Sequence, residues 1–266
     1  FIDLIPESKR WSASSKFTFA LGNRMEAYVD YTLSDTRGMS NGSPAVASAA
    51  SSTGFGNFST VVPAAFNPFG QDIVVGMIHY EFGSTWQKTH TKAHNAALGL
   101  RGTASSTWQW DAYVGYQKQI SHQLSRNFNA AALAPALSNP DPAQRLNPFR
   151  DARANGVTQA AIYETMALYP TVDSEADMRT VDVSANGELF SLPGGPVRMA
   201  VGAFADRNTN ESASTNYTLF GVTVNRTDTF IDGERDSFGA FTELSVPLVG
   251  TSNAKPGIRR LEMNLA

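Results

Sequence analysis

The stretch Met25-Glu-Ala-Tyr-Val-Asp-Tyr-Thr-Leu-Ser-Asp-Thr36 decides the fold class of this chain. Its odd-numbered residues from Met25 to Leu33 form one largely apolar series, while Glu26, Tyr28, Asp30 and Thr32 belong to the other. A β-strand directs successive side chains to opposite faces, so this stretch predicts a strand with one apolar and one polar face. The same alternation returns in residues 108–117, 181–190, 197–206 and 237–246.

The predicted connections alternate between short turns and long loops. We place eight strands, at residues 10–21, 25–36, 89–102, 108–120, 179–190, 197–208, 236–248 and 257–266. Short turns follow the first, third, fifth and seventh strands, and long connections cover residues 37–88, 121–178 and 209–235. Two-faced strands with this parity are typical of outer-membrane barrels. The sequence therefore predicts an all-β fold, an antiparallel transmembrane β-barrel segment with long extracellular loops and short periplasmic turns.

Two segments inside the long connections have patterns of their own. Residues 73–82 alternate weakly, but counting them as a membrane strand would break the parity of the connections. We therefore expect them to form a strand that extends beyond the bilayer, within the first long loop. Residues 151–168 carry apolar side chains at helical spacing, which predicts a helix that Tyr169-Pro170 would stop.

Composition narrows the possible functions. The 266 residues carry a net charge of -3, which argues against nucleic acid as a partner because a basic face is needed to bind phosphates. Charged residues make up only 17%, below the roughly 25% of soluble domains. The chain has no cysteine, which excludes disulfides and thiolate metal sites.

The sequence offers no catalytic constellation, and we predict that the protein is not an enzyme and has no cofactor. Neither a Gly-x-Ser-x-Gly elbow nor a phosphate-binding loop occurs. His90 and His94 would lie about 13 Å apart on a strand, too far to share a metal ion. Asp173, Glu175 and Asp177 could hold Ca²⁺ in the second long loop, but a solvated loop edge is the better interpretation. We therefore predict no metal site.

The two strand faces predict different surroundings. Aromatic residues near the strand ends, on the lipid side, predict an interfacial girdle: Trp11, Tyr31, Trp108, Trp110 and Tyr116. The opposite face carries charges of both signs, as a barrel interior would: Glu26, Asp30, Arg101, Asp111, Asp182, Glu188, Arg198, Asp206, Glu243 and Glu262. Mixed signs indicate no particular ligand charge.

The long loops are rich in aromatic residues, whose rings could stack on a ligand or hold the loops together. These residues are Phe55, Phe58, Phe66, Phe69, Phe128, Phe149, Tyr163, Tyr169, Tyr217 and Phe220. The sequence favours neither role, so the ligand-binding residues stay undetermined.

Several motifs resemble the central barrel of TonB-dependent outer-membrane receptors, in the subgroup common in alphaproteobacteria and xanthomonads. The most specific are the hairpin Ala185-Asn-Gly-Glu-Leu-Phe-Ser-Leu-Pro-Gly-Gly-Pro-Val197 and the strand Phe241-Thr-Glu-Leu-Ser-Val-Pro-Leu248. Shorter matches are Leu4-Ile-Pro-Glu7, Asn67-Pro-Phe-Gly70, Leu98-Gly-Leu-Arg-Gly102, Trp108-Gln-Trp-Asp-Ala-Tyr113, Asn147-Pro-Phe149, Asn253-Ala-Lys-Pro-Gly257 and Arg259-Arg-Leu-Glu262.

This resemblance implies a 22-stranded barrel closed by an N-terminal plug, in the outer membrane of a Gram-negative bacterium. It implies active uptake of a scarce nutrient, such as siderophore-bound iron or an oligosaccharide, driven by the TonB complex. The partners would then be outer-membrane lipid, the plug, the TonB complex and the nutrient. Because the chain opens on Phe1 and ends within an apparent strand at Ala266, we expect residues 1–266 to be part of the barrel, without the plug or the C-terminal strands.

Two other functions fit the alternation of strands. One is a soluble all-β carbohydrate-binding module or hydrolase, which would not require alternating loop lengths. The other is a complete small barrel that acts as an adhesin or passive pore, since eight strands can close a barrel.

Overall fold

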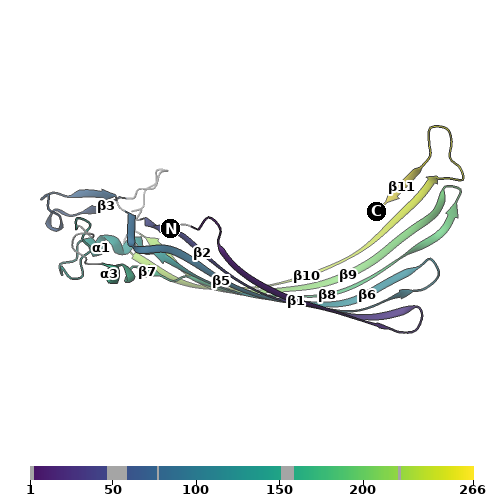
Figure 1. Ribbon diagram of the computed structural model, residues 1–266, viewed down its shortest axis with the longest axis horizontal. Helices are drawn as coiled ribbons and strands as arrows, with labels where there is room; N and C mark the ends of the chain where they lie inside the picture. Colours follow the sequence, from purple (N-terminus) through teal and green to yellow (C-terminus); the bar gives the residue numbers. More distant parts are fainter. Residues whose placement is uncertain (1–2, 47–58, 77, 151–158, 221–222) are drawn as a thin grey trace.

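The computed structural model describes residues 3–46, 59–76, 78–150, 159–220 and 223–266. Eight strands form the continuous path of one long antiparallel sheet, and the short strand β7 (Ala167–Leu168) pairs with the end of β6 as its ninth strand (Figure 1). The eight strands of the path are β1 (Glu7–Ala20), β2 (Met25–Val46), β5 (Ile78–Thr103), β6 (Gln109–Phe128), β8 (Thr171–Leu192), β9 (Gly195–Phe220), β10 (Thr223–Val249) and β11 (Leu261–Leu265). The prediction of an all-β antiparallel fold is confirmed.

The sheet has two unlike ends. Short connections join the strands at one end, which we call the turn end (Figure 1). The opposite end, the loop end, carries the small elements. These are β3 (Ser59–Val62), η1 (Ala64–Phe66), β4 (Ile73–Gly76), η2 (Ala130–Ala132), α1 (Leu133–Leu137), α3 (Ala160–Glu164) and β7 (Ala167–Leu168). We call this group of elements the loop cap.

Within the described ranges the sheet is open, with β1 and β11 at its two edges. The edge strand β1 pairs over its full length with β2, whereas β11 pairs with only the last part of β10. Each edge therefore presents backbone groups on one side with no neighbouring strand in the sheet.

The strands are longer than predicted, mostly toward the loop end. The strand predicted to end at residue 36 continues to Val46, and the one predicted from residue 89 begins at Ile78. The apolar–polar alternation marks only part of each strand, because pairing of backbone N–H and C=O groups continues where both faces are polar.

The prediction of a third long loop, residues 209–235, is wrong. β9 and β10 pair continuously from Arg198 and Ser245 to Phe220 and Thr223, so these residues form an extended hairpin. Threonine favours strands, but polar side chains on both faces leave no hydropathy signal to reveal the pairing.

Three smaller predictions need correction. Ile73–Gly76 form β4 in a separate hairpin with β3, as expected for a strand within the first loop, but Ile78 already begins β5 of the main sheet. The helix predicted over 151–168 is only α3 in the described part, with β7 following, and residues 151–158 lie outside it. The last strand begins at Leu261 rather than residue 257.

The hydrophobic core lies in the loop cap and not on the sheet. Its buried side chains come from the two long connections and the adjoining strand ends: Val62, Phe82, Leu133, Leu137, Leu146, Tyr163 and Met166. Most apolar side chains of the sheet itself are partly or fully exposed. The cap thus forms a packed unit at the loop end, while the sheet leaves both faces accessible.

Candidate functional site

Strand register assigns the side chains of the sheet to two faces. Directly paired residues share a face, so Val29 lies beside Leu98, Leu98 beside Val114, and Val114 beside Val181. We call the face that carries Val29 the apolar face, and the opposite one, which carries Glu26, the polar face.

The apolar face holds a continuous band without charge. Its largest side chains are strongly exposed, with 57% of Phe17, 56% of Leu98 and 55% of Val181 accessible. From the turn end, every strand from β1 to β10 contributes only apolar, Gly, Ser or Thr residues to this face before the first ionisable residue. A soluble protein rarely leaves a contiguous apolar surface of this kind open.

The edge of this band crosses the sheet obliquely. On each strand we mark the last apolar side chain before the first ionisable one: Trp11, Leu33, Ala96, Tyr116, Val181, Ala205 and Phe238. Six successive pairings from β1 to β10 align Trp11 with Asp232 on β10. The edge of the band on β10 is at Phe238, six residues away from Asp232. The edge therefore shifts by one residue per strand on average.

This shift corresponds to a strand tilt. The edge moves ~3.4 Å along the strands, one residue, for each ~4.8 Å step from strand to strand. The strands are therefore tilted by about 35° from the perpendicular to the edge of the band. On β1 the band runs from Trp11 to Phe19, which at this tilt spans about 22 Å.

Aromatic side chains lie at both limits of the band. Trp11, Tyr31 and Tyr116 lie near its loop-end limit and Trp110 near its turn-end limit. Tyr31 and Tyr116 were predicted near strand ends, but they lie within β2 and β6 because these strands continue toward the loop end. Trp108 lies just before β6, where its indole crosses Gly187 and its Nε1 donates a hydrogen bond to the Glu188 carbonyl at 2.9 Å.

The polar face carries all ten charged residues predicted for it. They follow the strand parity, and several form contacts across strands, including the ion pair between Arg101 and Glu26. Tyr28 lies almost buried on this face and donates a hydrogen bond to Asp111 at 3.0 Å. Its ring crosses Gly99 on the neighbouring strand, where a side chain would collide with it. Aromatic rings are thus held flat against the sheet.

In the loop cap, two copies of one turn bring the long connections together. In Asn67-Pro-Phe69 and in Asn147-Pro-Phe149, the asparagine Oδ1 accepts a hydrogen bond from the phenylalanine N–H, at 2.8 and 3.0 Å. The two phenylalanine rings meet edge to face, with centroids 5.9 Å apart. The sequence did not lead us to predict this contact, although the repeated Asn-Pro-Phe motif was a signal for it.

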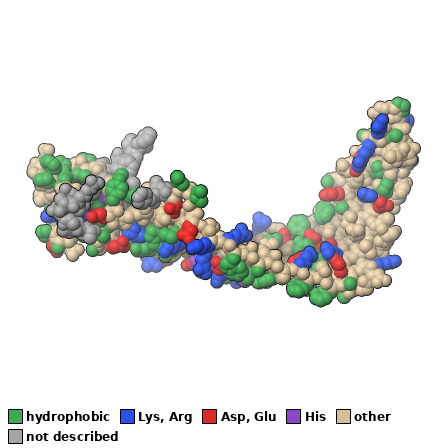
Figure 2. Space-filling view, in the orientation of Figure 1, with side chains coloured by type: hydrophobic (Ala, Val, Ile, Leu, Met, Phe, Trp, Pro, Cys, Tyr) green, Lys and Arg blue, Asp and Glu red, His purple; other side chains and the backbone are tan. Residues whose placement is uncertain are grey.

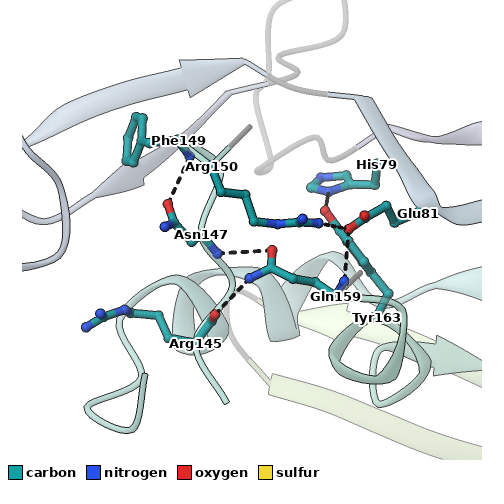
Figure 3. A network of polar contacts seen from close by, with 8 residues as sticks. All are labelled: His79, Glu81, Arg145, Asn147, Phe149, Arg150, Gln159 and Tyr163. Carbon is teal, nitrogen blue, oxygen red and sulfur yellow. Dashed lines mark hydrogen bonds and ion pairs between the residues drawn. The ribbon is translucent and has the colours of Figure 1, made fainter. Parts of the chain in front are cut away.

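A polar network ties the second connection to the start of β5 (Figure 3). Glu81 forms an ion pair with Arg150 and accepts a hydrogen bond from the Gln159 backbone N–H at 3.3 Å. The Gln159 side chain bonds the backbone of Arg145 and Asn147, at 3.2 Å each. These contacts fix the second connection against the start of β5.

His79 is fully buried beside this network. Its Nδ1 and the Tyr163 hydroxyl are 2.9 Å apart, and its ring stacks on Phe128 at 4.8 Å. Among the described residues, its Nε2 has no hydrogen-bond partner. Burial lowers the pKa of His79 to about 4, and burial together with the nearby Glu81 charge raises the pKa of Tyr163 to about 12. Both side chains are therefore neutral near pH 7.

The residues considered for metal binding have separate partners. His90 contacts Asp35 at 2.9 Å, and His94 contacts Tyr31 at 2.8 Å. Asp173, Glu175 and Asp177 lie in β8 rather than in a loop, and they contact His122, Lys118 and Thr209 respectively. These contacts lie across neighbouring strands and do not converge on one point.

Most of the loop aromatics that the structure describes pack inside the protein. Tyr163 is a member of the cap core, and Phe66, Phe128 and Phe149 pack against it. Phe69 remains 63% exposed, and Tyr169 lies 6.3 Å from Trp86. Tyr217 lies in β9, as does the backbone of Phe220, while Phe55 and Phe58 lie outside the described residues.

Comparison with protein-family models and with curated protein sequences finds no match for this chain. No helix in the described ranges has the length and apolarity needed to cross a membrane.

Proposed function

We propose that this chain forms part of the wall of a TonB-dependent outer-membrane receptor, which takes up a scarce nutrient such as siderophore-bound iron or an oligosaccharide. In this proposal the apolar face contacts lipid, and the polar face lines the interior, where the plug and the passing nutrient lie. The loop cap lies outside the cell, and the TonB complex supplies the energy.

The observation that carries the proposal is the oblique, charge-free band. A slope of about 35° falls within the ~35–45° by which strands tilt in transmembrane barrels, and a height of about 22 Å is close to the ~25 Å of their apolar girdle. The charged residues of the strands are confined to the other face and to the parts of the strands beyond the band. The aromatic residues at its limits support the same orientation.

The open edges favour a larger barrel over a complete eight-stranded one. In lipid, unpaired backbone N–H and C=O groups cost several kcal/mol each, so β1 and β11 require neighbouring strands. The soluble alternative has less support, because a sandwich needs a second layer to cover the apolar face. Within the described ranges, the extra elements form a cap at the loop end instead.

Two adjacent substitutions test the proposed orientation. Val183→Arg places a charge in the middle of the band on the apolar face, and Ser184→Arg places the same charge on the polar face at nearly the same depth. We expect Val183→Arg to destabilise the assembled barrel by about 2–4 kcal/mol and Ser184→Arg to have little effect. The measurement is the amount of heat-modifiable, protease-resistant protein in the outer membrane, using the whole receptor.

Nutrient uptake is then measured in the cells that produce these proteins. Cells that produce the unmodified protein or the Ser184→Arg variant should accumulate one member of a panel of ferric chelates and oligosaccharides, and an uncoupler should abolish this accumulation. Equal assembly of both variants would refute the orientation, and uptake that resists the uncoupler would refute active transport.

A further inference from the structure

Beyond the apolar band, the apolar face carries basic residues on six strands that are consecutive in the sheet, and we consider the one nearest the band on each strand. We call these residues the basic belt: Lys9, Arg37, Lys92, Lys118, Arg179 and Arg207. Their side chains lie on the same face as the band and within four residues of its edge. Figure 2 shows Lys and Arg side chains gathered over the middle of the long sheet.

The order of charges along the strands separates this belt from a randomly mixed surface. On β1, β6, β8 and β9, the first charged side chain beyond the band is basic. The carboxylates that contact Lys9, Lys118 and Arg179 lie one side-chain row farther from the band, at Glu7, Glu175 and Asp177. Next to these three residues, positive charge therefore lies between the apolar band and the carboxylates, whereas on β2 Asp35 lies between the band and Arg37.

The ion pairs leave the belt accessible. The side chains of Lys9, Arg37 and Arg179 are 79%, 68% and 71% exposed, that of Arg207 is 54% exposed, and that of Lys118 is 31% exposed. Ion pairs between exposed side chains contribute little stability. An arginine guanidinium also has five N–H donors, and a single carboxylate cannot occupy all of them. An anion that approaches from the side of the band can therefore bind without displacing the carboxylates.

We infer that the basic belt binds the phosphate groups of phosphorylated lipids in the leaflet next to the loop cap. The inference rests on the proposed membrane orientation. A lipid whose acyl chains cover the apolar band must hold its headgroup at the edge of that band, where the belt lies. Basic residues next to an apolar surface attract anionic headgroups. A soluble phosphate lacks the chains that would hold it there.

The test measures lipid retained by the whole receptor, extracted from the outer membrane in mild detergent, by native mass spectrometry. The probes are bisphosphorylated lipid A and the same lipid with its phosphates removed. The triple variant Lys118→Gln, Arg179→Gln, Arg207→Gln removes half of the belt. The control variant Lys255→Gln, Arg259→Gln, Arg260→Gln removes the same charge from the exposed turn end.

We expect the unmodified and control proteins to bind bisphosphorylated lipid A at least about tenfold more tightly than the triple variant does. The unmodified protein should also prefer it to the dephosphorylated lipid, a comparison that needs no variant to fold. Equal binding of the two lipids, or full displacement by millimolar inorganic phosphate, would overturn the inference. If the protein assembles in the membrane but binds lipid A independently of the belt, only this inference fails. If the unmodified protein does not assemble there, the proposed function fails as well.

Discussion

At the scale of single residues, glycines on the polar face make room for aromatic rings. The Tyr28 ring crosses Gly99 and is held at its end by Asp111. Phe204 and Phe241 cross Gly239 and Gly202 in the same way, toward the other edge of the sheet. The rings lie along the wall and do not project from it, which in the proposed barrel would keep the interior wide.

Gly99→Ala tests this packing. An added Cβ would lie 2.2 Å from Cζ of Tyr28, so the ring must move and its hydrogen bond to Asp111 is strained. We expect a loss of about 1–3 kcal/mol in stability, measured by urea unfolding of the receptor in detergent. Gly233→Ala is the matched control, because nothing lies within 4 Å of its added Cβ. Equal losses in both variants would contradict the explanation.

His79 predicts a pH dependence of the loop cap. Burial lowers its pKa to about 4, whereas the unfolded side chain titrates near 6.5. Below pH 6.5 the unfolded cap therefore binds more protons than the folded cap. The stability that burial of neutral His79 contributes is complete above pH 6.5 and is lost as the pH falls toward 4. The loss reaches up to about 3 kcal/mol.

Hydrogen exchange of the cap amides, corrected for intrinsic rates, should therefore show increasing opening between pH 6.5 and 4. His79→Phe should remove most of this slope, while replacing the exposed His122 by Gln should leave it unchanged. A slope that persists in His79→Phe would assign the effect to another group.

At the scale of elements, the loop cap depends on contacts between its two connections. It depends as well on the strand ends, since the buried guanidinium of Arg126 in β6 donates to the Phe82 carbonyl of β5 at 2.7 Å and contacts Glu164 of α3. The two Asn-Pro-Phe turns add the contact between Phe69 and Phe149. A cap with its own core can keep its shape at the loop end, which in the proposed receptor would suit the capture of a ligand.

Phe149→Ala should loosen the cap without affecting the sheet. The ring packs against the cap core and against Phe69, so its removal should cost about 1–3 kcal/mol locally. Limited proteolysis should then cut the connection between β6 and β8 faster. Phe230→Ala, which removes a ring that is 66% exposed on β10, should not change this rate. Faster cutting in both variants would point to a general loss of stability.

At the scale of the whole molecule, the described structure is an uncovered sheet with a packed cap at one end (Figure 1). Apolar side chains are exposed along one face, and two edges have no neighbouring strand. Such edges and faces promote aggregation in water.

We therefore expect the 266-residue chain, expressed alone, to collect in the insoluble fraction and to give no cooperative unfolding transition in plain buffer. Solubility after centrifugation and a thermal melt measure this directly. A monodisperse sample with a sharp melt would contradict the uncovered arrangement.

The sequence by itself determined the two faces of the strands and the all-β class. Alternation is a local property, because each strand directs successive residues to opposite sides whatever its neighbours are. It also determined that Glu26, Arg101 and Asp111 share the polar face.

Tertiary structure alone decided where the strands end, that residues 209–235 continue a hairpin, and that the two Asn-Pro-Phe turns meet. It also decided the register that makes the band oblique. These features depend on backbone pairing and ring contacts between segments far apart in the chain, and polar strand extensions leave no hydropathy pattern to predict them.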